Sequence, residues 1–183
     1  WNSISDSINS APLIFSRNAS SIKNSKLTPI FFVCQEWAFQ IQNFFQAFAM
    51  VGGIFYLISP NLILNLINSP IHLLNFALFT FWMPLLIAIL GIKFTDLFQL
   101  LPVLTNLLFL LSPILYAKKN LGRLGIIADF NPIYQILRLL RSSLIEGQSF
   151  LMPGLFIFCI NIIMIFITLN IYNRVKNKLV FYL

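Results

Sequence analysis

The residues able to carry out chemistry in this 183-residue chain are few and far apart. There are five carboxylates and one histidine, spread along the sequence as Asp6, Glu36, His72, Asp96, Asp129 and Glu146. Acid–base catalysis needs such groups to converge within hydrogen-bond reach. No spacing here brings two of them onto one face of a helix or strand, and a structural or interfacial role is expected for the isolated histidine. The sequence therefore predicts no catalytic residues, and a protein that is not an enzyme.

Motifs that bind nucleotides, metals or acyl groups are also missing from the sequence. There is no G-x-x-x-x-G-K-[ST] loop to cradle ATP phosphates, no zinc-ligand spacing and no nucleophile elbow. Cys34 and Cys159 lie in apolar stretches, where they are expected to be buried thiols that act as small hydrophobes. We therefore predict no metal site and no cofactor bound by this chain.

The chain that positions these residues is very apolar: 58% of its residues are hydrophobic and 9% are charged. Soluble domains carry about 25% charged residues, so the composition favours lipid over water. The net charge of +7 does not indicate nucleic acid, because the basic residues are scattered between apolar stretches and form no stripe. The prediction is an all-α, multi-pass membrane protein without a nucleic-acid partner.

Gaps between charged residues predict where the chain crosses the membrane. No charged residue lies between Glu36 and Lys93, a gap long enough for two spans of about 20 residues. Proline, asparagine and serine residues within the gap signal a turn. Glu36, at the edge of the first span, is expected at the cytoplasmic interface or paired with a nearby base. The four predicted spans are 30–58, 70–92, 97–117 and 150–172, within one transmembrane domain over 1–183.

The segments outside the spans are predicted to differ in character. Residues 1–29 are polar and are expected in the cytoplasm, with a short surface helix over 18–24, and 173–183 forms a basic cytoplasmic tail. In the extracytoplasmic region 118–149, Asn131-Pro132 is typical of a helix start and Gly147 of a helix end. The apolar residues between them follow helical spacing. This amphipathic helix is too short and too charged to span, so it is expected to be interfacial or re-entrant.

Aromatic side chains are abundant, with 20 phenylalanines. Most are expected to face lipid or to pack between helices. A subset could line a pathway, because aromatic faces stack on sugar rings. The candidate pathway residues are Phe44, Phe48, Phe55, Tyr56 and Trp82.

Three segments together resemble a known family. Leu111-Ser112-Pro113-Ile114-Leu115-Tyr116 is followed by Asn131-Pro132-Ile133-Tyr134, then by Arg141 and Gly147. Polar residues including Asn18, Ile22 and Lys23 precede a span that opens at Pro29. The turn Ile92-Lys93-Phe94-Thr95-Asp96-Leu97 departs from the family's Arg-Asp-Leu in having Thr95 at the arginine position. In order and spacing, these segments resemble the permease subunits of type-2 ABC exporters for O-antigen, capsule or teichoic-acid-like polymers.

The resemblance implies a six-span subunit of the bacterial cytoplasmic (inner) membrane, of which the first two spans are absent here. It implies a homodimer that works with two ABC ATPase subunits, which bind ATP and Mg²⁺, and that moves a lipid-linked glycan outward. The implied ATPase-coupling residues are Arg17, Asn18, Ile22 and Lys23. The implied re-entrant helices that cap the exit carry Ser112, Pro113, Tyr116, Asn131, Pro132 and Arg141.

Other functions fit parts of the same sequence. A permease of the same type for a drug or a small lipid is the nearest alternative, although the Ser-Pro and Asn-Pro elements favour polysaccharide. A membrane-embedded glycosyl- or acyltransferase would need convergent acidic or histidine residues. A non-transporting membrane scaffold is a further alternative, and the only argument against it is that the charge-poor spans contain proline.

Overall fold

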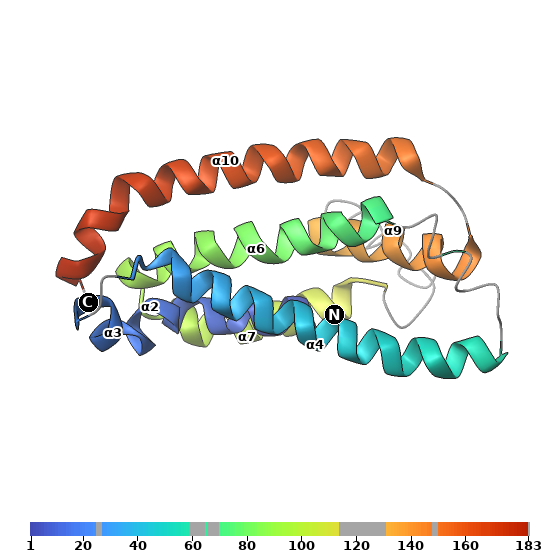
Figure 1. The fold of residues 1–183 in the computed structure, drawn as a ribbon, viewed down its shortest axis with the longest axis horizontal. Coiled ribbons are helices and arrows are strands. Elements are labelled where there is room, and N and C mark those ends of the chain that lie inside the picture. Colours follow the sequence, from blue (N-terminus) through green and yellow to red (C-terminus); the bar gives the residue numbers. More distant parts are fainter. Residues whose placement is uncertain (25–26, 59–64, 66–69, 114–130, 148–149, 183) are drawn as a thin grey trace.

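The computed structural model describes residues 1–24, 27–58, 65, 70–113, 131–147 and 150–182, and within these ranges every regular element is a helix. Four long helices run lengthwise beside one another (Figure 1). They are α4 (Ile30–Ile58), α6 (Pro70–Lys93), α7 (Leu97–Leu111) and α10 (Leu151–Tyr182). Chain direction alternates between successive members, so the ends of α6 and α10 lie with the start of α4 (Figure 1). We call this the α3 end, and the other the α9 end. The all-helical prediction is confirmed for the described residues.

Two of the four helices, α6 and α10, are long and apolar enough to cross a membrane by length and composition. The predicted segments 30–58 and 70–92 correspond closely to α4 and α6. In α4, the apolar run is interrupted by Gln, Glu and Asn residues in its first half. The helix predicted over 150–172 continues to Tyr182, so the expected tail is the last part of α10.

Helix α7 ends earlier than predicted. Its last residue is Leu111, and Ser112 is extended with φ −88° and ψ 126°. Ser112 precedes Pro113, and the ring of a proline disfavours helical backbone in the residue before it. Within the described residues, the helix at the predicted span 97–117 therefore covers only Leu97–Leu111. Residues 114–117 lie outside the described ranges.

The N-terminal residues pack inside the bundle over part of their length. They form α1 (Asn2–Ser10), a 3₁₀ turn η1 (Ala11–Leu13), α2 (Ile14–Arg17) and α3 (Ala19–Asn24). Helix α1 contacts α4, α6 and α7, and buries Ile4 and Ile8. Its polar side chains find partners there, because Thr105 donates to Asn9 at 3.2 Å and Ser10 donates to Glu36 at 3.2 Å. The first half of the predicted cytoplasmic segment 1–29 is therefore part of the core.

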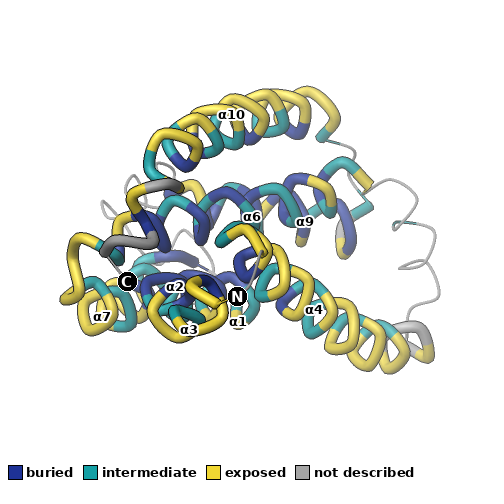
Figure 2. Tube along the Cα trace, turned by 60° about the vertical axis from the view of Figure 1, so that its left-hand side comes forward, coloured by how far each residue is buried: buried dark blue, intermediate teal, exposed yellow. Residues whose placement is uncertain are grey.

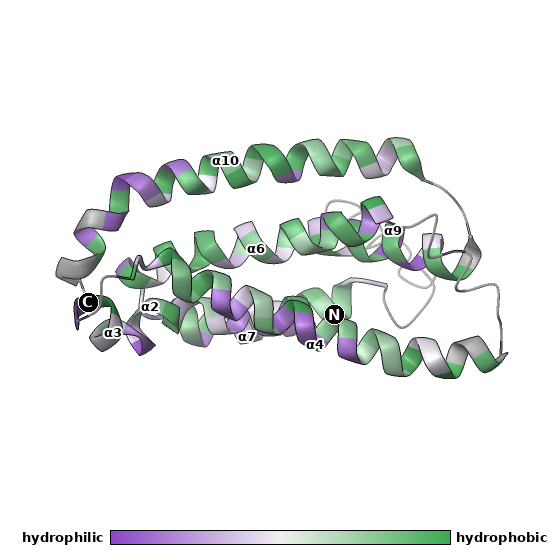
Figure 3. Cartoon of the chain, in the orientation of Figure 1, coloured by the Kyte–Doolittle hydropathy of each residue, from purple (hydrophilic) through white to green (hydrophobic). Residues whose placement is uncertain are grey.

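Burial is concentrated on α6, which packs against α10, α4, α9 and η1. Its most apolar stretch is 56% buried, whereas that of α10 is only 17% buried. Figure 2 shows that α10 and the C-terminal half of α4 are largely exposed. Figure 3 shows that the exposed face of α10 is mainly hydrophobic. Phe166 on α10 is 70% exposed and Leu57 on α4 is 84% exposed. Water would disfavour such large apolar patches, whereas lipid or a partner helix would cover them.

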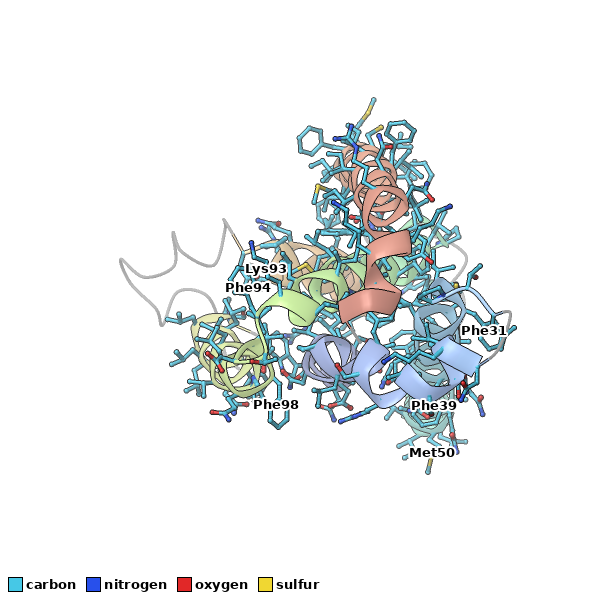
Figure 4. The ribbon with its side chains drawn as sticks, turned by 90° about the vertical axis from the view of Figure 1, so that its left-hand side faces the viewer. Phe31, Phe39, Met50, Lys93, Phe94 and Phe98 are labelled. Atoms are coloured by element: carbon cyan, nitrogen blue, oxygen red, sulfur yellow. The ribbon has the colours of Figure 1, made fainter. Side chains whose placement is uncertain are left out.

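The two cysteines lie on these uncovered faces. Cys34 on α4 and Cys159 on α10 are both exposed, so the expectation of buried thiols is wrong. Figure 4, viewed from the α3 end, shows the exposed Phe31, Phe39 and Met50 of α4 projecting away from the bundle. It also shows Lys93, Phe94 and Phe98 around the turn between α6 and α7. Apolar side chains are thus exposed on more than one side.

Candidate functional site

The Ser-Pro and Asn-Pro motifs meet in the structure, although 19 residues separate Ser112 from Asn131. Asn131 Nδ2 donates to Ser112 Oγ at 2.7 Å, and both side chains are buried. Asn131 Oδ1 accepts the backbone N–H of Ile133 at 3.0 Å, which is the N-cap bond of α9 (Pro132–Glu146). Pro132 occupies the first helical position, where its missing N–H is harmless. One asparagine therefore both starts α9 and fixes it to the end of α7.

Helix α9 follows the predicted pattern. It buries Ile133, Ile136, Leu139, Leu140 and Leu144, and it packs on α6. Gly147 ends it in the left-handed conformation, with φ 64°. Asn65 Nδ2 donates to the Leu144 carbonyl at 2.9 Å, which satisfies one of the free carbonyls at this helix end. Arg138 and Arg141 are exposed. Tyr116, which the resemblance places with these residues, lies outside the described ranges.

Helices α6 and α10 are joined by a buried set of hydrogen bonds. Trp82 Nε1 donates to Asn161 Oδ1 at 2.9 Å. Asn161 Nδ2 donates to Asn75 Oδ1 at 3.2 Å, and Asn75 Nδ2 donates to the Gly154 carbonyl at 2.8 Å. All four residues are buried. Buried polar groups are satisfied in this way wherever water is excluded, so these bonds fix the register of the two helices that are long and apolar enough to cross a membrane.

His72 extends this buried contact toward the α9 end. The imidazole is 1% exposed, and neither ring nitrogen has a hydrogen-bond partner in the part of the chain that the structure describes. It packs closely against α10, since a Cβ added at Gly154 would lie 2.9 Å from its Cε1. A structural or interfacial role was expected for this histidine, and that remains a prediction.

A pocket of about 500 Å³ opens beside the hydrogen-bonded set, between α6, α9 and α10. Its walls are mainly aromatic and aliphatic, and its polar groups are Gln135, Arg138, Trp82 and Asn161. The lining residues are Phe79, Trp82, Pro132, Gln135, Ile136, Arg138, Leu139, Phe150, Pro153, Phe156, Ile157, Ile160 and Asn161. Mostly apolar walls with a few convergent polar groups are typical of a small-molecule site.

We expect Asn161→Leu to lower the free energy of unfolding by about 1–2 kcal/mol, because it leaves the Trp82 N–H and the Asn75 amide without their partner. Thermal unfolding of the purified chain measures the change. Asn170→Leu is the matched control, since Asn170 is exposed on the same helix. An equal loss in both variants would show that the hydrogen bonds contribute nothing specific.

The candidate pathway aromatics are not gathered in one place. Phe44 packs on Phe76 with ring centroids 4.3 Å apart and on Phe48 at 5.9 Å, between α4 and α6. Trp82 instead faces α10 and the pocket. The side chains of Phe55 and Tyr56 lie outside the described part of the chain. Within a single chain, the described members of this set therefore belong to two separate helix contacts.

The four candidate coupling residues lie together at the α3 end but differ in exposure. Arg17 and Lys23 are exposed, whereas Ile22 is 5% exposed and belongs to the core. Asn18 shapes the turn, because its Nδ2 donates to the Ile14 carbonyl at 2.8 Å and its carbonyl accepts from Ile22 N. Arg17 and Asn18 also line a groove of about 610 Å³ between α2 and α4. Of the four, Arg17 and Lys23 are therefore the most accessible to a partner surface.

Glu36 lines the same groove and takes hydrogen bonds from two neighbours. Ser10 Oγ and Gln40 Nε2 each donate to its Oε1 at 3.2 Å. It therefore has uncharged partners from α1 and α4. The expectation that it pairs with a base finds no ion pair among the described residues.

Sequence reasoning missed the hydrogen-bonded set between α6 and α10. A signal was present, since Asn75 and Asn161 are strongly polar residues inside apolar stretches, where such residues usually bond across helices. No family model matches the chain, and no curated protein is significantly similar to it.

Proposed function

We propose that this chain is the membrane-spanning permease subunit of an ATP-driven exporter that moves a lipid-linked polysaccharide out across the bacterial cytoplasmic membrane. In this proposal α4, α6 and α10 cross the membrane, α7 enters it from the α3 end, and the α3 end faces the cytoplasm. Two copies form the translocation path, and each works with a separate ABC ATPase subunit. The exposed apolar faces of α10 and α4 support a membrane position, because lipid stabilises surfaces that water does not.

The observation that carries the proposal is the buried junction between Ser112 and Asn131. Helix α7 has 15 residues, which at 1.5 Å each span about 22 Å and fall short of the roughly 30 Å hydrocarbon layer. Helix α9 starts at this junction and runs along α6 toward the α9 end (Figure 1). Helices α7 and α9 both run toward the α9 end, so α9 runs outward from the depth at which α7 stops. A short helix that starts at membrane depth and runs outward fits the extracytoplasmic re-entrant region that the family resemblance implies. Such irregular backbone is tolerated at membrane depth where it is buried in protein.

The α3 end supports the coupling role. Two short helices there present the exposed Arg17 and Lys23 beside a groove. Lys176 and Lys178 are exposed near the end of α10 at the same end. Basic residues are enriched on the cytoplasmic side of membrane proteins. A chain without an ATP-binding loop needs an external motor, and this basic surface is where we place it.

We expect the double variant Arg17→Glu/Lys23→Glu to lose binding to the partner ATPase, because like charges facing each other at an interface cost several kcal/mol. Both side chains are exposed, so the unfolding temperature should be unchanged. Co-purification of the tagged chain with the Walker A ATPase of its source organism measures the binding. Lys176→Glu/Lys178→Glu is the matched control for bulk charge at the same end.

The outcomes separate two parts of the proposal. If the wild-type chain captures no such ATPase, the exporter assignment fails. If the wild-type chain and the Arg17→Glu/Lys23→Glu variant bind the ATPase equally, the exporter assignment stands but the coupling surface lies elsewhere.

A further inference from the structure

We propose that the pocket between α6, α9 and α10 binds one phosphate-bearing lipid, with the Arg138 guanidinium on the phosphate and the lipid chain along the apolar walls. The inference rests on the proposed function only in placing α6 and α10 in a membrane. It concerns a site within a single chain, separate from a path between two copies.

The walls of the pocket suit a hydrocarbon chain. Phe79 comes from α6, Leu139 from α9, and Ile157 from α10, so apolar side chains from three helices face the same space. Phe156 and Ile160 line it too, and they are 69% and 42% exposed. The pocket is therefore continuous with the uncovered apolar face of α10. A lipid chain can enter from that side without crossing water.

The polar groups of the pocket suit an anion. Within the described ranges, Arg138 is the one charged residue that lines it, and no carboxylate does. Among the described residues, nothing forms a hydrogen bond or an ion pair with the Arg138 guanidinium. An unpaired charge beside apolar walls in a membrane is costly, and a phosphate would remove that cost by accepting two parallel N–H bonds.

Together these features favour a lipid phosphate over a free anion. A free phosphate would gain the arginine but would leave the apolar walls unfilled. A neutral lipid would fill the walls but would leave the arginine unpaired. A phosphate-bearing lipid satisfies both, and the pocket of about 500 Å³ is large enough for part of one chain.

Trp82 lies in the pocket and can report on it. A chain carrying Trp1→Phe and Trp37→Phe leaves Trp82 as the single fluorophore. The experiment places this chain in phosphatidylcholine nanodiscs with a minor fraction of lipid brominated on its acyl chains, since bromine quenches tryptophan on contact. Brominated phosphatidic acid is compared with brominated diacylglycerol, because the two differ only in the phosphate.

We expect phosphatidic acid to be preferred by roughly tenfold, the size expected for a charge-assisted hydrogen-bonded pair. Arg138→Gln should remove the preference, and Arg138→Lys should retain part of it. Arg141→Gln is the matched control, since Arg141 is exposed on the same helix and does not line the pocket. Wild-type chain compared with Trp82→Phe repeats the measurement if the two tryptophan substitutions disturb folding.

Several results would overturn the inference. They are equal quenching by the two lipids, a preference that survives Arg138→Gln, and an equal loss of preference in Arg141→Gln. Loss of the preference on adding inorganic phosphate to the buffer would instead assign the site to a free anion. The measurement needs no ATPase, so its failure and the failure of the exporter assignment are distinguishable.

Discussion

Replacing Gly91 with alanine should destabilise the fold by about 3 kcal/mol or more, the upper range for overpacking a tight contact. Helix α6 passes the η1 turn so closely that a Cβ at Gly91 would lie 2.6 Å from Pro12 Cα and 2.7 Å from the Pro12 carbonyl oxygen. Both atoms are backbone, so a rotamer change cannot relieve the clash. The first fifteen residues would have to separate from α6. The measurement is thermal unfolding of the purified chain, with protease cleavage near residue 12 as a local readout.

Gly53→Ala is the matched control for this prediction. Gly53 also lies inside a helix, but a Cβ there meets nothing within 4 Å. Alanine favours helix over glycine by up to about 1 kcal/mol, so this change should be neutral or stabilising. If Gly91→Ala unfolds at the same temperature as the wild-type chain, η1 does not pack against α6 as described.

The helices that carry strong sequence signals were predictable. Charge gaps placed segments at 30–58 and 70–92, and the helices cover Ile30–Ile58 and Pro70–Lys93. Asn131-Pro132 and Gly147 bound α9 as predicted, because their backbone preferences are local. These features depend on hydrophobicity and capping, which neighbouring residues determine.

The position of the N-terminal residues could not be read from their average polarity. Residues 1–15 carry many serines and asparagines, yet Ile4, Ile8, Ala11 and Phe15 recur at helical spacing and are all buried. That periodicity was the available signal. The sequence does not show which residue each polar side chain will bond, such as Thr105 with Asn9. Partners on distant helices are decided by packing, which local patterns do not specify.

The candidate site likewise has one feature that the sequence predicted and others that only tertiary packing determines. The resemblance singled out Ser112 and Asn131 by their order along the chain, and the structure brings them into contact. The pocket lined by Arg138 was not predicted, because it exists only where α6, α9 and α10 come together. Tertiary packing likewise separated Phe44 from Trp82, which one aromatic-rich pattern had grouped.

Asn131→Ala should lower the free energy of unfolding by about 2–4 kcal/mol, which makes it the second large effect. It removes the N-cap bond to Ile133, worth about 1 kcal/mol. It also leaves the buried Ser112 hydroxyl without its donor, a further cost of about 1–3 kcal/mol. Asn131→Asp is the informative comparison, because aspartate keeps an oxygen for the cap but can bond Ser112 only by accepting from its hydroxyl.

A double-mutant cycle with Ser112→Ala separates the two contributions, since residues in direct contact are coupled. If the buried bond matters, Ser112→Ala should cost less in the Asn131→Ala background than in the wild-type chain. Export activity is a second readout. If the Ser112–Asn131 bond holds α9 in a re-entrant position, breaking the bond should also reduce export. Additive losses in stability would mean that Asn131 acts as a helix cap alone, and the argument for a half-helix pair at membrane depth would lose its main support.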